Sequence, residues 1–148
     1  MVYRAVVGII VAAGGLIQLV PIGHGHTNPA VVSEPAWDSS RTRQLAKRAC
    51  FNCHSNETIW PWYSGIAPIS WLTERDVKGG RSHLNFSDWN SSQGETENGE
   101  AEKVEERVRT GAMPPWFYLP MHPEAKLTPD EKKALIDGLQ KSMKDSGR

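Results

Sequence analysis

An apolar segment opens the chain and covers residues 2–22, broken only by Tyr3, Arg4 and Gln18. The stretch from Ala5 to Ile22 is 18 residues long. That length lies at the lower edge of a membrane-spanning helix and exceeds the usual apolar part of a cleavable signal peptide. A buried core helix is disfavoured because the segment has no polar face. We therefore expect a transmembrane helix over residues 1–22.

The single charge near the start of this segment predicts its orientation. Arg4 would keep the N-terminus in the cytoplasm, and the positive-inside rule then places the residues after Ile22 outside. The expected location is the cytoplasmic (inner) membrane, with the rest of the chain in the periplasm. Small residues at Gly23 and Gly25 form a weak cleavage signal, so a removed signal peptide is the alternative interpretation.

The rest of the chain predicts a linker and one helical domain. Residues 23–38 are rich in Gly, Pro, Asn and Ser, as linkers are, and residues 39–148 suffice for one domain. Two helices are expected in the first half of this domain: one over 40–49, capped by Ser39 or Ser40, and one from 67 or 68 to 77, ended by Gly79-Gly80. Two more are expected in the second half: one over 100–109, ended by Gly111, and one that begins at the capping box Thr128-Pro129-Asp130-Glu131. Loops are expected over residues 55–64, around Pro61, and over residues 85–99, which would be exposed. Because no stretch alternates as a strand does, the predicted fold is all-α.

The residues Cys50-Phe51-Asn52-Cys53-His54 form a C-x-x-C-H motif, the attachment signature of a c-type haem. Cys50 and Cys53 are the only cysteines of the chain. Two thiols at this spacing would each bond one vinyl group of the same porphyrin, and His54 would supply the proximal ligand of the iron. The motif therefore predicts one covalent haem c per chain, attached outside the cytoplasm by a haem-attachment machinery.

Three other chemistries use closely spaced cysteines, and each fits less well. A thioredoxin-like redox pair needs a preceding strand and has no use for His54. A structural zinc site needs four ligands, and the chain has no second cysteine pair. A disulfide between Cys50 and Cys53 would close a very small, strained loop.

Composition adds two observations. The formal net charge is zero, so the chain lacks the basic excess of a nucleic-acid-binding protein, and nucleic acid is not an expected partner. Six tryptophans are many for 148 residues, and four of them lie between positions 60 and 89. They would serve equally well against the flat face of a porphyrin or in an ordinary small core.

An electron-carrying haem iron needs a sixth ligand. The candidates are Met113, His83, Met121, His122, His24 and His26. Met113 is favoured because Pro114 and Pro115 stiffen the backbone after it, and a thioether ligand would also raise the reduction potential. The competing interpretations are that Met113 packs in the core, as most methionines do, and that His83 is the ligand.

Several motifs beyond C-x-x-C-H carry a resemblance. They are Cys-Phe-Asn-Cys-His-Ser-Asn-Glu-Thr-Ile-Trp-Pro-Trp-Tyr-Ser at 50–64, Ile-Ala-Pro-Ile-Ser-Trp at 66–71, residues 80–89, Met113-Pro114-Pro115-Trp116 with Tyr118, His122 and Pro123, and Gln18 with Asn28-Pro29. Together they resemble the bacterial haem-binding domain family of small c-type-cytochrome-like proteins over nearly the whole chain. The resemblance implies a single covalent haem in a cytochrome c-like helical domain and says little about physiology.

Further residues are candidates for positions near the haem. In the resemblance, His83 lies in a Gly-Arg-x-His-Leu-Asn-Phe stretch, and it would bond a haem propionate, alone or with Arg81, or cap local backbone. The haem or the core would be lined by the tryptophans Trp60, Trp62, Trp71, Trp89 and Trp116. Of these, Trp60, Trp62 and Trp116 are the candidates for positions near the haem.

The favoured function is a membrane-anchored, extracytoplasmic mono-haem cytochrome that passes single electrons and is not an enzyme. One alternative is a haem enzyme or a gas or redox sensor with an open distal site, although no distal Arg-His pair is evident near Met113. Another is a haem-bearing module of a larger complex. The sequence names no redox partner.

Overall fold

The computed structural model of the protein describes residues 2–23, 25–89 and 100–146. Its elements are α1 (Val2–Ile17), α2 (Ser40–Ala49), α3 (Phe51–His54), η1 (Trp62–Gly65), α4 (Ile69–His83), α6 (Glu100–Arg109), η3 (Pro123–Ala125) and α7 (Pro129–Ser146), where η marks a 3-10 helix. Within the described ranges there is no strand, and the one backbone bridge, between Ser33 and Asp88, is isolated. The predicted all-α character is therefore confirmed.

Helix α1 corrects the prediction of a transmembrane helix over residues 1–22. It has 16 residues and ends at Ile17, so it rises by about 24 Å, less than the roughly 30 Å of bilayer hydrocarbon. No helix among the described residues is long and apolar enough to cross a membrane, and the prediction was wrong. Beyond the helix end, the side-chain amide of Gln18 pairs with the backbone N–H and C=O of Ala67, each at 3.0 Å.

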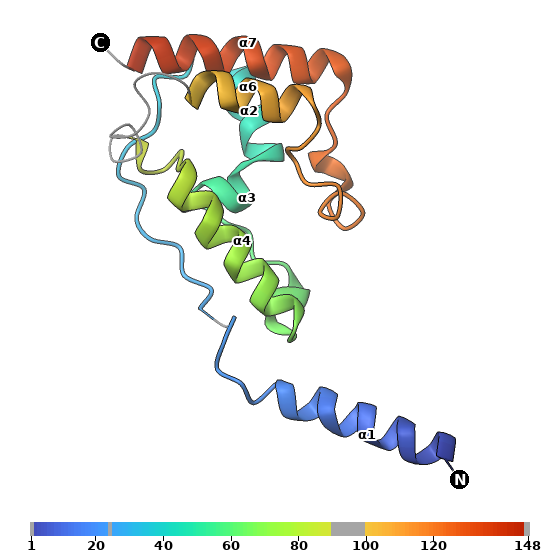
Figure 1. The fold of residues 1–148 in the computed structure, drawn as a ribbon. Helices are drawn as coiled ribbons and strands as arrows, with labels where there is room; N and C mark the ends of the chain where they lie inside the picture. The colour runs from blue at the N-terminus through green and yellow to red at the C-terminus, as the bar shows by residue number, and fades with distance from the viewer. Residues whose placement is uncertain (1, 24, 90–99, 147–148) are drawn as a thin grey trace.

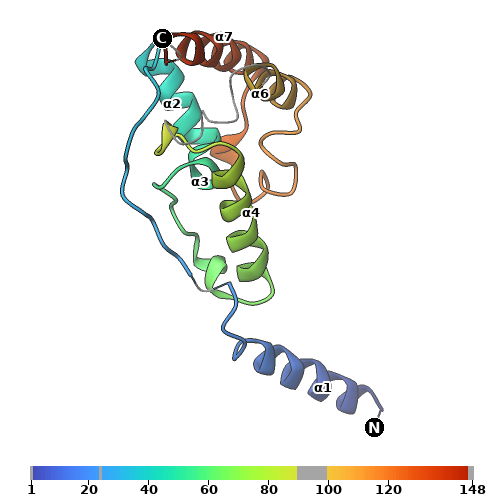
Figure 2. The ribbon, with the colours of Figure 1, turned by 60° about the vertical axis from the view of Figure 1, so that its left-hand side comes forward.

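Of the segment predicted as a linker over residues 23–38, residues 25–38 run alongside the helical domain, as the blue trace in Figure 2 shows. Asn28 Nδ2 donates to the carbonyl of Thr58 at 2.8 Å, and Val32 N donates to the carbonyl of Ser87 at 2.8 Å. Much of this extended stretch is thus fixed by hydrogen bonds to the domain. Helix α1 lies apart from the other helices in both views (Figure 1, Figure 2).

Three helix ends lie where local signals predicted them. Ser39 caps α2, its Oγ accepting from the backbone N of Thr42 at 3.2 Å. Gly111 follows α6 with φ of 76°, which only glycine adopts readily. At the start of α7, Thr128 N donates to Glu131 Oε2 at 2.9 Å, and Glu131 N donates to Thr128 Oγ1 at 3.2 Å. This exchange is the predicted capping box.

Helix α4 is longer than predicted. It does not end before Gly79 and Gly80 but continues through both to His83. A Cβ on Gly80 would collide with the carbonyl oxygen of Cys53, whereas one on Gly79 would meet nothing within 4 Å. Gly80 therefore lets α4 approach α3 closely and does not stop the helix.

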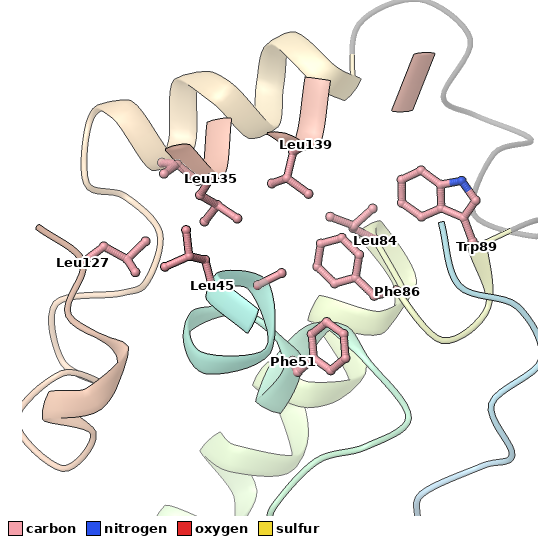
Figure 3. Packing of buried hydrophobic residues seen from close by; sticks show 10 residues of the cluster. Leu45, Phe51, Leu84, Phe86, Trp89, Leu127, Leu135 and Leu139 are labelled. Carbon is pink, nitrogen blue, oxygen red and sulfur yellow. The ribbon is translucent and has the colours of Figure 1, made fainter. Parts of the chain in front are cut away.

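The core lies between α2, α6, α7 and the segment after α4 (Figure 3). Its buried members are Leu45, Ala46, Phe51, Leu84, Phe86, Trp89, Val108, Leu127, Leu135 and Leu139. The rings of Phe51 and Phe86 stack with centroids 5.5 Å apart. Residues 85–99 were predicted to form an exposed loop. This prediction is wrong for residues 85–89, because Phe86 and Trp89 are only 1% and 4% exposed. Residues 90–99 lie outside the described part of the chain.

Candidate functional site

The C-x-x-C-H motif forms one helical turn directly after α2. Cys50 ends α2 and precedes α3, which holds Cys53 and His54. The backbone N of Cys53 and of His54 both donate to the carbonyl of Cys50, at 3.1 and 2.9 Å. Residues at i, i+3 and i+4 of such a turn share one side of it. The two thiols and the imidazole are therefore presented together.

Both thiols are free and half-buried. Burial raises the pKa of Cys50 to about 12, with a further contribution from Cys53. Burial and then Asp76 raise the pKa of Cys53 to about 11, against the opposing effect of Arg81. A thiol–disulfide redox pair depends on a lowered thiol pKa, so these raised values argue against the thioredoxin-like interpretation. Among the described residues, no group of three or more His, Cys, Asp or Glu is placed to hold a metal ion.

The ring of His54 is oriented by the backbone that follows α4. Its Nδ1 lies 3.0 Å from the carbonyl oxygen of Leu84. Because a carbonyl only accepts, Nδ1 carries the hydrogen, and the lone pair of a neutral ring then lies on Nε2. Burial lowers the pKa of His54 from its ordinary value, against the hydrogen bond to Leu84, and so favours the neutral ring. This is the state in which an imidazole ligates a metal.

Arg81 is bound by several protein acceptors. Its guanidinium donates to Ser55 O at 2.8 Å, Thr27 O at 3.0 Å, Asn28 Oδ1 at 3.0 Å and Thr58 Oγ1 at 2.9 Å. These bonds join α4 to the residues after the haem motif and to the extended N-terminal segment. The structure thus gives Arg81 a structural role of its own. His83 is exposed at the last residue of α4.

Asn52, between the two cysteines, connects the motif to the loop after α6. Its Nδ2 donates to the hydroxyl of Tyr118 at 2.7 Å, and its Oδ1 accepts from the backbone N of Ile59 at 3.1 Å. The ring of Tyr118 stacks on His122 with centroids 4.0 Å apart. His122 in turn contacts the Tyr63 hydroxyl at 2.6 Å.

Sequence reasoning did not find this cluster of Asn52, Tyr63, Tyr118 and His122. Asn52 and Tyr118 alone are 66 residues apart along the chain, so no local pattern joins the cluster. The available signal was that Tyr118 and His122 fall within the motifs that carry the family resemblance, as do Asn52 and Tyr63.

Met113 lies in the same loop as Tyr118, five residues before it in the sequence. It is half-buried, and its backbone N donates to the carbonyl of Arg107 at 3.0 Å. A pocket of about 130 Å³ adjoins it, lined by Gly111, Met113, Pro114, Leu119, Lys126, Leu127 and Lys132. Neither cysteine nor His54 lines this pocket. The structure links Met113 to the motif through its loop and not through a shared cavity.

The three tryptophans proposed to lie near the haem differ in environment. Trp60 is half-buried and stacks on His26, with ring centroids 4.5 Å apart. Trp62 and Trp116 are 76% and 80% exposed. None of the three belongs to the buried core cluster. Trp62 and Trp116 therefore present large apolar surfaces that the described part of the chain leaves uncovered.

The donor set of this site fits a c-type haem. The two thiols and His54 come from one turn, and the Leu84 carbonyl leaves Nε2 of a neutral His54 ring as the nitrogen that would ligate iron. In addition, Gly80 keeps the backbone of α4 close behind Cys53.

Comparison with known proteins supports haem binding. No curated protein and no solved structure matches the chain at a significant level. The model of one family, described as a haem-binding domain, matches residues 12–141, most of the sequence. With Cys50, Cys53 and His54 arranged as described, this match establishes that the chain belongs to the haem-binding domain family.

Proposed function

We propose that this haem-binding protein is a c-type cytochrome that holds one haem covalently and passes single electrons. Cys50 and Cys53 would each form a thioether with a vinyl group, and His54 Nε2 would be the proximal ligand. The haem would supply a one-electron couple. The observation that carries the proposal is the hydrogen bond from His54 Nδ1 to the Leu84 carbonyl, 3.0 Å long, beside two thiols of the same turn.

The protein's contribution is to fix and shield the cofactor. The Leu84 carbonyl sets the tautomer and direction of the His54 ring, so this ligand would not reorganise when the charge of the iron changes. Asn52 and Gly80 hold the attachment turn between the loop after α6 and helix α4. A small reorganisation favours electron transfer over chemistry at the metal.

A sixth ligand separates an electron carrier from an enzyme or sensor. We place Met113 in this role, because its loop reaches the motif through the bond between Tyr118 and Asn52. Two filled axial positions leave no place for a substrate on the iron. We also place the helical domain outside the cytoplasm, where c-type haem is attached by a dedicated machinery, and expect its redox partners there.

Covalent attachment is tested by expressing the chain together with a cytochrome c maturation system. The wild type should retain haem on a denaturing gel and show the mass of one haem per chain. The variant with both Cys50→Ala and Cys53→Ala should retain none after denaturation. A matched double variant, Ser82→Ala with Thr110→Ala, changes two side chains outside the motif and should stain like the wild type. Absence of stain from the wild type would refute the proposal.

A further inference from the structure

Both ring nitrogens of His122 form hydrogen bonds. Its Nδ1 lies 2.9 Å from Glu124 Oε1, and the hydroxyl of Tyr63 lies 2.6 Å from its Nε2. Because a carboxylate accepts, Nδ1 carries a hydrogen, and in the neutral ring Nε2 accepts from Tyr63. The side chain is 12% exposed. The ring thus has one nitrogen that can take up a proton while its orientation stays fixed.

The His122 ring is connected to the haem-attachment turn. Tyr118 stacks on it, with an interplanar angle of 8°, and the Tyr118 hydroxyl accepts a hydrogen bond from Asn52 between the two cysteines. Burial raises the pKa of Tyr118 to about 12, against the opposing effect of the hydrogen bond with Asn52. Burial also raises the pKa of Tyr63. The stacked ring of Tyr118 and its hydrogen bond to Asn52 therefore join His122 to the attachment turn.

We propose that His122 takes up one proton when the haem is reduced, so that the protein carries an electron and a proton together. This inference rests on the proposed function. The electron comes from an external one-electron donor, and the proton comes from solvent and binds Nε2. The Tyr63 hydroxyl then changes from donor to acceptor, while Nδ1–H stays on Glu124. Reoxidation releases the electron to an acceptor and the proton to solvent.

The coupling has an electrostatic cause. Reduction adds one negative charge to the haem, which favours a positive imidazolium nearby, and partial burial weakens the screening by water. The Glu124 carboxylate stabilises the same imidazolium from the other side. By linkage, a proton that binds more tightly to the reduced protein raises the reduction potential as the pH falls.

Several titratable groups face His122. Among the described residues, the titratable groups facing it are Tyr63 from η1, Tyr118 from the preceding loop and Glu124 from η3, with Cys53 of α3 beyond the tyrosines. The pKa of each tyrosine is raised, and that of Glu124 is lowered by hydrogen bonds to its own backbone and to His122. Histidine ordinarily titrates between pH 5 and 8, where these other groups do not.

The test is the midpoint potential of the purified haem-loaded protein as a function of pH from 5 to 9. In the wild type the potential should fall with rising pH, by up to about 59 mV for each tenfold drop in proton concentration, the value for one proton per electron. His122→Gln should remove most of this slope. Glu124→Gln should move the sloping region to lower pH, because the imidazolium loses its carboxylate. His26→Gln, a histidine outside the cluster, should keep the wild-type curve.

A second measurement follows the His122 ring by NMR and needs no variant that must fold. In the wild type this ring should take up its proton at a higher pH in the reduced than in the oxidised protein. The coupling would be overturned if the His122 ring took up its proton at the same pH in both redox states, or if His122→Gln kept the dependence of the midpoint potential on pH. Either result would leave the proposed one-electron carrier unaffected. A protein without reversible one-electron reduction would overturn both this inference and the proposed function.

Discussion

Gly80 of α4 lies against the backbone of Cys53 in the haem-attachment turn. A Cβ at Gly80 would collide with the Cys53 carbonyl oxygen and lie 2.8 Å from its carbonyl carbon and 3.1 Å from its Cβ. The obstacle is backbone, which cannot rotate away as a side chain can. The close packing of α4 on the attachment turn therefore requires glycine at this position.

Gly80→Ala should destabilise the protein by roughly 1–3 kcal/mol, the range for overpacking a tight contact. Gly79→Ala is the matched control, because a Cβ there meets nothing within 4 Å, and it should stabilise α4 by roughly 0.5–1 kcal/mol through helix propensity. Urea unfolding of the two variants, followed by circular dichroism, measures the difference. Equal stabilities would show that α4 does not press on Cys53 as described.

Arg81 offers a test of the contact between α4 and the extended N-terminal segment. Arg81→Gln loses most of four hydrogen bonds, two of them to Thr27 and Asn28. We expect a loss of about 2–4 kcal/mol, since single hydrogen bonds to charged groups contribute about 1.5–3 kcal/mol and do not add fully.

Arg75→Gln provides the control for Arg81, because Arg75 is an exposed arginine of the same helix. Its stability should stay within about 0.5 kcal/mol of the wild type. Limited proteolysis of Arg81→Gln should also cut sooner within residues 25–38. If the two variants unfold alike and are cut alike, the guanidinium does not hold that segment.

Glu34 and Arg43 predict an acid-dependent loss of stability. Arg43 donates to both carboxylate oxygens of Glu34, at 2.7 and 2.6 Å, and this hydrogen bonding lowers the Glu34 pKa from its ordinary value of 4.5. The unfolded chain therefore binds a proton at higher pH than the folded chain does. The contribution of the pair is complete above that ordinary value and is lost as the pH falls through the lower, folded-state pKa.

Glu34→Gln should therefore be less stable than the wild type at pH 7, by no more than about 1 kcal/mol because both partners are partly exposed. The gap should narrow as the pH falls below the ordinary Glu pKa. Urea midpoints at pH 7, 5, 4 and 3 would follow it. A gap that stays constant down to pH 3 would mean that the carboxylate charge of Glu34 is not its source.

Helix boundaries that depend on local chemistry could be predicted from the sequence. Hydrogen bonds to backbone N–H groups within three residues are made by Ser39 and by the pair of Thr128 and Glu131. Gly111 adopts the positive φ that follows α6. Because these effects are local, they can be recognised from the sequence alone. The spacing of Cys50, Cys53 and His54 likewise predicts haem attachment from adjacent residues alone. Their roles toward haem remain predictions that the experiments above address.

Features that depend on distant contacts could not be predicted. The length of the apolar segment suggested a transmembrane helix, yet the helix ends before Gln18, whose partner Ala67 is 49 residues away. The Gly79-Gly80 pair was predicted to end the helix. The actual reason for glycine at position 80, its close contact with Cys53, leaves no pattern in the local sequence. The polar residues around Phe86 suggested an exposed loop, but Phe86 completes an aromatic stack with Phe51 of the attachment turn.

Met113 decides whether the iron carries electrons or binds ligands. If its sulfur is the sixth ligand, the oxidised wild type should be low-spin with a weak sulfur-to-iron charge-transfer band, and the reduced form should bind carbon monoxide poorly. Met113→Ala should remove the band, lower the potential and open the iron to carbon monoxide. Met121→Ala, at a methionine that is 55% exposed, should change none of these.

The same spectra test the competing ligand. His83→Ala should leave the charge-transfer band in place, since His83 is exposed at the end of α4. A reversed pattern, in which Met113→Ala is silent and His83→Ala opens the iron, would assign two histidine ligands. A wild type that binds carbon monoxide readily would instead favour a sensor or enzyme, because an open sixth position permits ligand chemistry. A closed sixth position supports the proposed electron carrier, and its opening by Met113→Ala assigns Met113 as the ligand.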